Sequence, residues 1–213
     1  MFQIEEQLKK LQEDIAPYTP NIIAVTKYFG RDGIIEAYRA GLRNFGESRI
    51  PEATEKIASL PEEIRRNSKF HMIGHLQSNK VKKVVGVFEY IHSVDTIDIA
   101  KKISEEAKRQ GIVQKVFLQI NNANEEQKFG FTKQGILKEY ESITKLSGIE
   151  VVGLMNIAPN IQNSQRLKEL FTDIKELGTE LGLKEFSMGM SNDYKEAVDS
   201  GATFIRVGRK LFS

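Results

Sequence analysis

The sequence contains no cysteine and no tryptophan, and only 5 of its 213 residues are proline. Without cysteine it has no disulfide framework, no thiolate nucleophile and no thiolate-bound zinc. No apolar run is long enough to cross a bilayer, so we expect no membrane-spanning helix. These absences exclude disulfide-rich secreted folds and cysteine-dependent enzymes.

An excess of charge of one sign is also absent. The 31 basic and 29 acidic residues nearly cancel and leave a formal charge of +2. No basic block supplies the attraction that nucleic acid requires, so we expect no nucleic-acid partner. The amino-terminal residues are acidic where a signal peptide would be basic. We therefore expect a cytoplasmic protein.

What the sequence does contain is a repeated alternation of short apolar runs and amphipathic segments. Ile4, Leu8, Leu11 and Ile15 recur at helical spacing and predict an amino-terminal helix that ends before Pro17. The run 22–25 is apolar on both faces, which is typical of a parallel strand covered by helices. Further strands are predicted over 43–46, 69–73, 87–92, 115–121, 150–155, 184–188 and 203–207. Helices are predicted over 33–40, 51–60, 78–85, 96–110, 132–145, 164–181 and 194–200.

Eight strand–helix units in this length predict one domain over residues 1–213. At about 27 residues per unit, the pattern favours an α/β fold, a single (β/α)8 TIM barrel with an extra N-terminal helix. An open doubly wound sheet is the rival architecture. A dinucleotide-binding version of it would carry G-x-G-x-x-G after its first strand, whereas this sequence reads Thr-Lys-Tyr-Phe-Gly at 26–30.

Lys27 stands directly after the first strand, at the barrel end where active sites form. A lysine surrounded by barrel walls is partly desolvated, which favours the neutral amine. That amine can attack a carbonyl group and form a Schiff base. The alternative is a lysine whose stem packs on apolar neighbours while its ammonium group reaches water.

The loops after the last two strands carry the signals of a phosphate site. Ser191 follows a Met-Gly-Met turn near a predicted helix start, and Gly208 and Arg209 follow the final strand. Backbone N–H groups at such turns bind phosphate, and barrel phosphate sites often use these two loops. Taken singly, Ser191 is interpreted as a helix cap and Gly208 as a turn; together, beside Lys27, they favour a phosphorylated ligand.

Arg206 lies within the last predicted strand, between Ile205 and Val207. If its two neighbours pack under the helices, alternation along the strand points Arg206 into the barrel. A charge there needs a partner, either a carboxylate or a ligand atom. In the opposite register Arg206 is a surface residue, and the sequence leaves both possibilities open.

Polar residues stand at other strand ends as well, among them Asn44 and the pair Met155-Asn156. The sequence offers no convincing metal site. His71 and His75 are four residues apart, but Gly74 interrupts any helix between them. We therefore expect no bound metal.

Several of these motifs occur in the same order in one known family. The sequence resembles the pyridoxal phosphate homeostasis proteins, whose fold is similar to the N-terminal barrel of alanine racemase. The matching stretches read Ile-Ala-Val-Thr-Lys at 23–27, Asn-Phe-Gly-Glu at 44–47, His-Met-Ile-Gly-His-Leu-Gln-Ser-Asn-Lys at 71–80, Gly-Leu-Met at 153–155, Phe-Ser-Met-Gly-Met-Ser at 186–191 and Ile-Arg-Val-Gly at 205–208.

The resemblance implies that the cofactor is pyridoxal 5′-phosphate, held as a Schiff base on Lys27. It implies that Ser191, Gly208 and Arg209 hold the phosphate and that Arg206 faces the pyridine nitrogen. A cation at that nitrogen keeps it unprotonated and weakens the ring as an electron sink. Asn44 and Met155, within the matching motifs, are further candidates for cofactor binding.

Three functions remain open at this stage. The first is a carrier that buffers pyridoxal phosphate or delivers it to apo-enzymes. The second is a weak pyridoxal phosphate-dependent amino-acid racemase, which requires an acid and a base on opposite faces of the substrate carbon. The third is a phosphosugar enzyme that uses Lys27 without a cofactor. In alanine racemase a tyrosine of an added domain is the second base; because this sequence ends soon after Gly208, we expect no such domain, a monomer, and a carrier rather than an enzyme.

Overall fold

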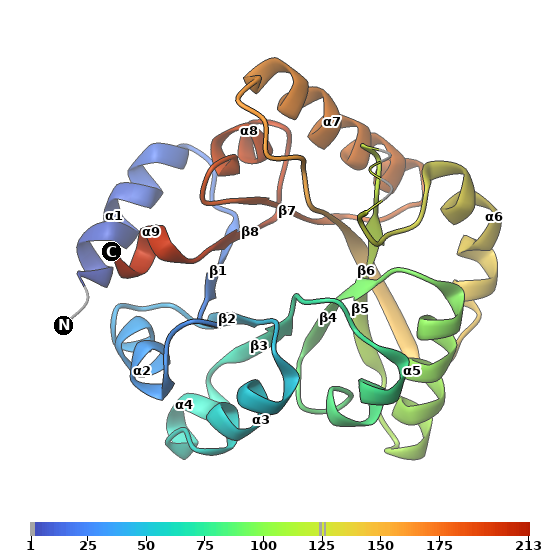
Figure 1. Ribbon diagram of the computed structural model, residues 1–213, viewed down its shortest axis with the longest axis horizontal. Helices are drawn as coiled ribbons and strands as arrows, with labels where there is room; N and C mark the ends of the chain where they lie inside the picture. Colours follow the sequence, from blue (N-terminus) through green and yellow to red (C-terminus); the bar gives the residue numbers. More distant parts are fainter. Residues whose placement is uncertain (1–2, 124, 126) are drawn as a thin grey trace.

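Eight parallel strands hydrogen-bond side by side in chain order and close into a barrel, because β1 also pairs with β8 (Figure 1). This computed structural model describes residues 3–123, 125 and 127–213. The strands are β1 Asn21–Val25, β2 Asn44–Glu47, β3 Lys69–Met72, β4 Tyr90–Val94, β5 Gln114–Ile120, β6 Ile149–Asn156, β7 Glu185–Met190 and β8 Phe204–Val207. The predicted (β/α)8 fold is confirmed.

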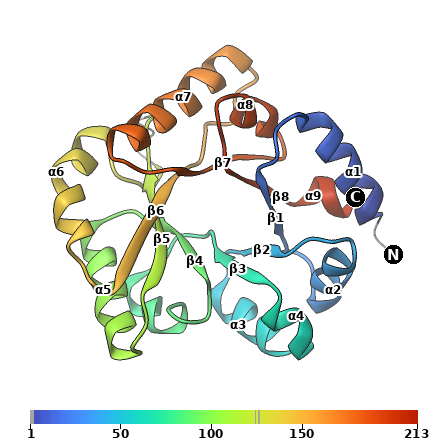
Figure 2. The same ribbon diagram turned by 180° about the vertical axis from the view of Figure 1, so that it is seen from behind.

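Helices surround the barrel in both views (Figures 1 and 2). They are α1 Ile4–Ile15, α2 Arg31–Arg39, α3 Ile50–Ala58, α4 Glu62–Arg66, α5 Ile97–Arg109, α6 Lys133–Thr144, α7 Ser164–Glu180, α8 Tyr194–Asp199 and α9 Arg209–Phe212, together with a 3₁₀ helix, η1 Ser78–Lys83. Within the described residues, no helix has the length and apolar character that spanning a membrane requires.

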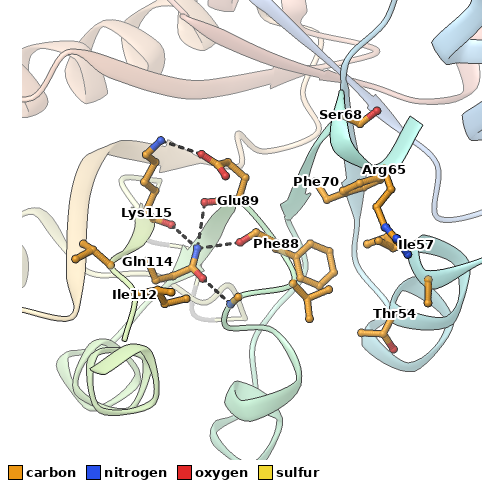
Figure 3. A pocket seen from close by; sticks show the side chains of 14 residues that line it. Thr54, Ile57, Arg65, Ser68, Phe70, Phe88, Glu89, Ile112, Gln114 and Lys115 are labelled. Carbon is orange, nitrogen blue, oxygen red and sulfur yellow. Dashed lines mark hydrogen bonds and ion pairs between the residues drawn. The ribbon is translucent and has the colours of Figure 1, made fainter. Parts of the chain in front are cut away.

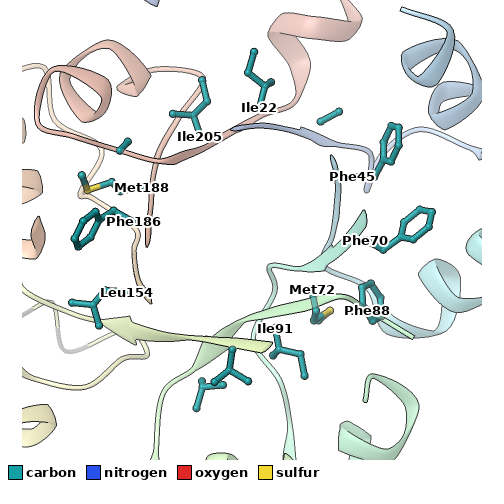
Figure 4. Packing of buried hydrophobic residues seen from close by; sticks show 14 of the residues in the cluster. Ile22, Phe45, Phe70, Met72, Phe88, Ile91, Leu154, Phe186, Met188 and Ile205 are labelled. Carbon is teal, nitrogen blue, oxygen red and sulfur yellow. The ribbon is translucent and has the colours of Figure 1, made fainter. Parts of the chain in front are cut away.

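The main hydrophobic core lies between the strands and the helices. Side chains such as Ile22, Phe45, Phe186 and Ile205 point outward from the barrel wall toward the helices (Figure 4). Each fully buried side chain of this size contributes roughly 1.5–3 kcal/mol of hydrophobic stabilisation. This layer of apolar contacts fixes the ring of helices and, with it, the loops at the strand ends.

The extra N-terminal helix completes the ring where the last unit is short. Helix α9, which follows β8, has only four residues, and α1 contacts it as well as α2 and α8. The four apolar residues of α1 that the sequence singled out are all buried. The predicted amino-terminal helix is therefore confirmed, and it covers the side of the barrel at which β8 meets β1.

The barrel interior combines apolar and polar side chains. Ile23, Phe117, Met155 and Phe204 form a small buried cluster inside the barrel. His92 stacks on Phe117, with ring centroids 4.2 Å apart. The presence of polar groups inside the barrel means that each of them needs a hydrogen-bond partner there.

The structure corrects the fourth predicted strand, which was placed over 87–92 and is β4 at Tyr90–Val94. The preceding segment is a loop because its backbone groups bond to the Gln114 side chain instead of to a neighbouring strand. The Gln114 amide accepts from Gly86 N–H and donates to the carbonyl oxygens of Phe88 and Glu89. The helix predicted over 78–85 is the 3₁₀ helix η1, and the short helices α4 and α9 were not predicted.

Candidate functional site

The carboxyl ends of the strands surround a cavity of about 700 Å³. Its lining residues belong to the last residues of the strands or to the loops after them. They are Val25, Lys27, Tyr28, Phe29, Ser48, Ile73, Gly74, His75, Ile157, Ala158, Pro159, Asn160, Ile161, Met190, Ser191, Asn192, Asp193, Arg206, Gly208 and Arg209. This size is typical of a pocket for a small molecule. Five of the predicted site residues, Lys27, Ser191, Arg206, Gly208 and Arg209, lie together in it.

Lys27 is half-buried and projects from a firmly held turn after β1. The Thr26 hydroxyl donates to the Glu47 carboxylate at 2.6 Å, and Thr26 is fully buried. Lys56 donates to the same carboxylate at 2.7 Å and to the Thr26 carbonyl oxygen at 2.9 Å. These bonds fix the turn. Because Glu47 is already paired with Lys56, the Lys27 amine takes no part in this ion pair.

The turn after β7 presents Ser191 and Asn192 to the cavity. Met190 N–H donates to the Asp193 carboxylate at 2.5 Å, and Asp193 N–H donates to the Met190 carbonyl oxygen at 3.1 Å. Gly189 precedes this turn with φ +89°, in the left-handed region that glycine adopts readily. Asp193 rather than Ser191 is the residue before α8, so Ser191 does not serve as that helix's cap.

The turn after β8 lies against the end of β1. Gly208 is the last residue before α9, and a Cβ atom added to it would lie 3.4 Å from the Val25 carbonyl oxygen and from the Val25 Cβ. Arg209 follows it on the cavity wall. Because β1 and β8 are hydrogen-bonded neighbours, this turn and the Lys27 turn lie at adjoining positions on the rim.

Arg206 points into the barrel, as one of the two open registers predicted. It is 4% exposed, while its neighbours Ile205 and Val207 are in the core under the helices. Its guanidinium group donates to the carbonyl oxygen and the hydroxyl of Ser187, at 2.6 and 2.8 Å, and to the Asn156 carbonyl oxygen at 2.7 Å. Burial lowers the Arg206 pKa to about 10, so the group is still a cation at neutral pH.

Three of the five N–H groups of Arg206 are used in these bonds. The other two have no acceptor among the described residues, although Arg206 lines the cavity. Their partner in the interior is therefore a ligand atom or water. Its two protein partners among the residues that the structure describes, Ser187 and Asn156, are neutral. The structure therefore does not pair Arg206 with a carboxylate, one of the two partners that the sequence allowed.

Asn44 and Met155 do not line the cavity. Asn44 is the first residue of β2, at the amino end of the barrel, and its Oδ1 lies 3.0 Å from His71 Nε2. Met155 is fully buried in the interior cluster, against which the cavity residue Ile157 packs. Met155 directly precedes Asn156, whose carbonyl oxygen accepts from Arg206.

His75 and Phe129 lie at the cavity edge, and sequence reasoning did not identify Phe129. The His75 ring stacks on Phe129 with centroids 3.7 Å apart, and its Nδ1 lies 3.1 Å from the buried Asp95 carboxylate. Burial raises the Asp95 pKa above its usual value. Both rings also line a smaller cavity of about 190 Å³ that shares Ile73, His75 and Ile157 with the main one. His75, Asp95 and Phe129 come from the loops after β3, β4 and β5, so only the folded structure brings them together.

A further cavity, of about 630 Å³, lies at the amino ends of β3 and β5, on the opposite face (Figure 3). Among its charged groups, which also include Arg65, Lys115 and Glu89 pair with one another at 2.8 Å. The Gln114 amide is bonded to backbone groups, as the dashed lines in Figure 3 show. The amino-terminal face of such barrels usually contributes to stability, and these contacts do the same here.

The main cavity suits a small anion with a carbonyl group. Lys27, Arg206 and Arg209 bring positive charge to it, and Asp193 is the single carboxylate among its described lining residues. Burial raises the Asp193 pKa, while the bond from Met190 N–H and the charge of Arg206 act in the opposite direction. No group of three or more metal-ligating side chains is found in the described part of the chain.

The fold and the cavity define a (β/α)8 barrel whose mouth joins a lysine amine to two anion-binding turns. Residues 1–213 match the family model described as alanine racemase, N-terminal domain. The pyridoxal phosphate homeostasis protein of a Synechocystis species is 40% identical over 208 residues, which cover 94% of each chain. This chain belongs to that family, as its sequence predicted.

Two solved structures of PipY from Synechococcus elongatus have the same fold. The structure without pyridoxal phosphate has a TM-score of 0.92, with 36% identity over 99% of this chain and 100% of that one. The structure with pyridoxal phosphate bound has a TM-score of 0.88 at the same identity and coverage. These likenesses extend over the whole barrel rather than over one motif.

Proposed function

We propose that this protein binds pyridoxal 5′-phosphate reversibly and acts in its homeostasis, as a reservoir that buffers the cofactor or delivers it to apo-enzymes. The observation that carries the proposal is the meeting of Lys27, Arg206 and the turns at Ser191 and Gly208 around one cavity. The binding of pyridoxal phosphate by PipY, which has the same fold at 36% identity, supports the choice of ligand.

In this proposal Lys27 is the covalent attachment point. Its amine attacks the cofactor aldehyde, and loss of one water molecule leaves an imine; addition of water reverses the step. The cofactor itself, when bound, supplies an electron-withdrawing ring. The firmly held Thr26–Glu47–Lys56 contacts keep the Lys27 turn in place whether the amine is free or bound.

The phosphate is assigned to the two turns. Ser191 offers a hydroxyl, and Arg209 offers a positive charge beside Gly208. A charge-assisted hydrogen bond to phosphate is about twice as strong as a neutral one. The free N–H groups of Arg206 are assigned to the pyridine nitrogen, which as their acceptor stays unprotonated.

We assign no catalytic role to the bound cofactor. Racemisation needs acid and base groups on both faces of the substrate carbon. Tyr194 is engaged elsewhere, because its hydroxyl donates to Asp14 at 2.6 Å and it is 3% exposed. Tyr28 is 65% exposed to water. The relatives found are named as homeostasis proteins, which agrees with a carrier.

We further propose that residues 1–213 act as one binding domain, as a monomer in the cytoplasm.

The attachment is tested by loading the protein with pyridoxal phosphate, reducing it with borohydride and mapping the labelled peptide. The label is expected on Lys27, and Lys27→Ala is expected to remove it, whereas the matched control Lys195→Ala keeps it. A label spread over surface lysines would overturn the assignment.

The carrier and the racemase are distinguished by hydrogen exchange. The loaded protein is incubated with single-enantiomer amino acids in deuterated water, beside the same concentration of free pyridoxal phosphate. A carrier gives no more deuterium at Cα than the free cofactor does. Steady deuteration above that control would replace the carrier with a weak racemase.

A further inference from the structure

A continuous line of hydrogen-bonded side chains runs through the barrel interior, from its amino end to the cavity. Asn44 Oδ1 lies 3.0 Å from His71 Nε2, and His71 Nδ1 lies 2.9 Å from His92 Nε2. His92 Nδ1 lies 2.9 Å from the Ser187 hydroxyl, which accepts from Arg206 at 2.8 Å. We call these five residues the internal relay.

The chemistry of its two ends fixes the direction of every bond in the internal relay. At one end, the Asn44 carbonyl oxygen only accepts, so His71 Nε2 carries a proton and His71 Nδ1 is the acceptor for His92 Nε2–H. At the other end, Arg206 only donates, so the Ser187 hydroxyl accepts from it; among the described residues, His92 Nδ1 is the acceptor that the structure offers for the hydroxyl proton, which therefore points there. Both ends give the same order, in which each group donates toward Asn44.

This order requires both histidines to be neutral. If either ring carried two protons, two N–H groups would face each other or the Ser187 hydroxyl would lose its acceptor. Both rings are fully buried, and this burial lowers the pKa of His71 to about 3 and that of His92 well below its usual value. The cations Lys69 and Arg206 act in the same direction.

Other titratable groups around the histidines do not supply a compensating negative charge. Tyr90 stacks on His71 with ring centroids 4.8 Å apart, and burial raises the Tyr90 pKa, so its hydroxyl is neutral. Lys115 and Glu89 lie near Tyr90 and pair with one another. The neutral state of the two rings is therefore set by the whole interior and not by one neighbour.

We propose that His71, His92 and Ser187 are positioning residues for Arg206, and that their single proton order couples the amino end of the barrel to the cofactor site. The second half rests on the proposed function, because Arg206 is there assigned to the pyridine nitrogen. The relay fixes the plane of the guanidinium group, so the two N–H groups without a protein acceptor keep one direction.

A charge introduced at Asn44 is expected to reverse the order. A carboxylate there stabilises a doubly protonated His71, whose Nδ1–H then donates to His92 Nε2. His92 must in turn carry its proton on Nδ1 and donate it to Ser187, whose own proton loses its acceptor. The Ser187 hydroxyl must then rotate to find another acceptor. This rotation disturbs its bond from Arg206, and the guanidinium group shifts.

The proton order is measured by ¹⁵N NMR of the histidine ring nitrogens in the full-length protein without cofactor. The sequence has only three histidines, so the spectrum of His75→Gln contains the signals of the two relay rings alone. We expect both in the Nε2–H form and uncharged from pH 6 to 8. A ring in the Nδ1–H form, or a charged ring in that range, would overturn the relay whether or not the protein binds pyridoxal phosphate.

The coupling is measured with Asn44→Asp and its matched control Asn21→Asp. Asn21 lies at the same end of the barrel, on β1, but is exposed and outside the relay. We expect Asn44→Asp to weaken retention of pyridoxal phosphate roughly tenfold, the effect of disturbing one hydrogen bond to a charged group. It should also shift the absorbance of the bound cofactor, while Asn21→Asp does neither. Equal behaviour of the two variants would overturn the coupling.

Ser187→Ala provides a second variant in case Asn44→Asp does not fold. It removes the link between His92 and Arg206 but leaves the Arg206 bond to the residue 187 carbonyl oxygen. We expect the ¹⁵N signal of His92 Nδ1 to shift, because it loses the Ser187 donor while the Asn44 end keeps the Nε2–H form, and retention to fall roughly tenfold. An unchanged His92 spectrum would overturn the relay. Absence of pyridoxal phosphate binding in the unmodified protein would overturn the proposed function and, with it, the coupling, whereas the proton order would still be decided by the NMR result, which does not depend on the cofactor.

Discussion

Arg206 holds Ser187 by both its backbone and its side chain: one guanidinium nitrogen donates to the Ser187 carbonyl oxygen at 2.6 Å and to its hydroxyl at 2.8 Å. This ties β8 to β7 inside the barrel, directly under the cavity. A buried cation with fixed partners can direct its free N–H groups at a ligand without reorganising.

Replacing Arg206 with Met keeps the length of the side chain but removes the charge and its N–H groups. We expect retention of pyridoxal phosphate to weaken about tenfold or more, because a charge-assisted bond is lost at the ring nitrogen. The carbonyl oxygens of Ser187 and Asn156 also lose a partner. Equilibrium dialysis measures the retention, and an unchanged dissociation constant would contradict the assignment of Arg206.

Ser191→Ala removes a hydroxyl from the turn assigned to the phosphate. We expect weaker retention of pyridoxal phosphate with no loss of stability, because the turn is closed by Asp193 and Met190 rather than by Ser191. Binding of pyridoxal, which lacks the phosphate, should be unaffected. If the two ligands are weakened equally, Ser191 does not act through the phosphate.

The glycine before this turn separates local strain from site geometry. At Gly189, with φ +89°, an added Cβ would lie 2.5 Å from the Ala197 Cβ, whereas Gly182, with φ +75°, has no atom within 4 Å of the added Cβ. Either change to Ala places a side chain in the left-handed region, at roughly 1–2 kcal/mol. Gly182→Ala should lower stability by that amount and leave binding intact.

Gly189→Ala should lower both stability and retention, since the clash with Ala197 displaces the Ser191 turn. Urea unfolding gives the first quantity and dialysis the second. Identical effects of the two glycine changes on binding would mean that the turn after β7 does not contribute to the site.

The ion pair under Lys27 is expected to matter for stability. Lys56→Met leaves the Glu47 carboxylate, which is 1% exposed, without its cation. Removing one partner of a buried pair costs about 3–5 kcal/mol, while replacing both can be neutral. We therefore expect Lys56→Met to be strongly destabilising and the double variant with Glu47→Gln to recover part of the loss. Additive effects in the unfolding free energies would contradict this coupling.

Stability should fall in acid because of His71. Its pKa is about 3 in the folded protein and 6.5 without burial, so the unfolded state binds more protons between these values. The stabilisation is thus complete above pH 6.5 and is lost as the pH falls toward 3. The slope is about 1.4 kcal/mol per pH unit for one histidine. His71→Gln should reduce the slope of the unfolding free energy by this amount, and an unchanged slope would show that His71 titrates in the folded state.

The regular alternation of apolar runs was sufficient to predict all eight strands, because strands covered on both faces leave a strong local signal. Residues that closely follow those strands, such as Lys27 and Arg209, could be placed at the cavity for the same reason. The strand at 87–92 was misplaced because Gln114, distant in sequence, satisfies the backbone of that segment. No local pattern contains that information.

Contacts between distant elements also explain what else was missed. Asn44 was taken as a cofactor ligand from its motif, but it opens its strand instead of ending it, and its side chain lies beside His71. The link from His71 through His92 to Ser187 joins three strands, of which the third follows almost a hundred residues later. Only the closure of the barrel brings these groups together.

The central claim is tested most directly by a crystal structure of the protein soaked with pyridoxal 5′-phosphate. We predict continuous electron density from Lys27 Nζ to the cofactor, with the phosphate between the Ser191 and Gly208 turns and the ring nitrogen against Arg206. A cofactor bound elsewhere, or density that ends at a free Lys27 amine beside a vacant cavity, would contradict it.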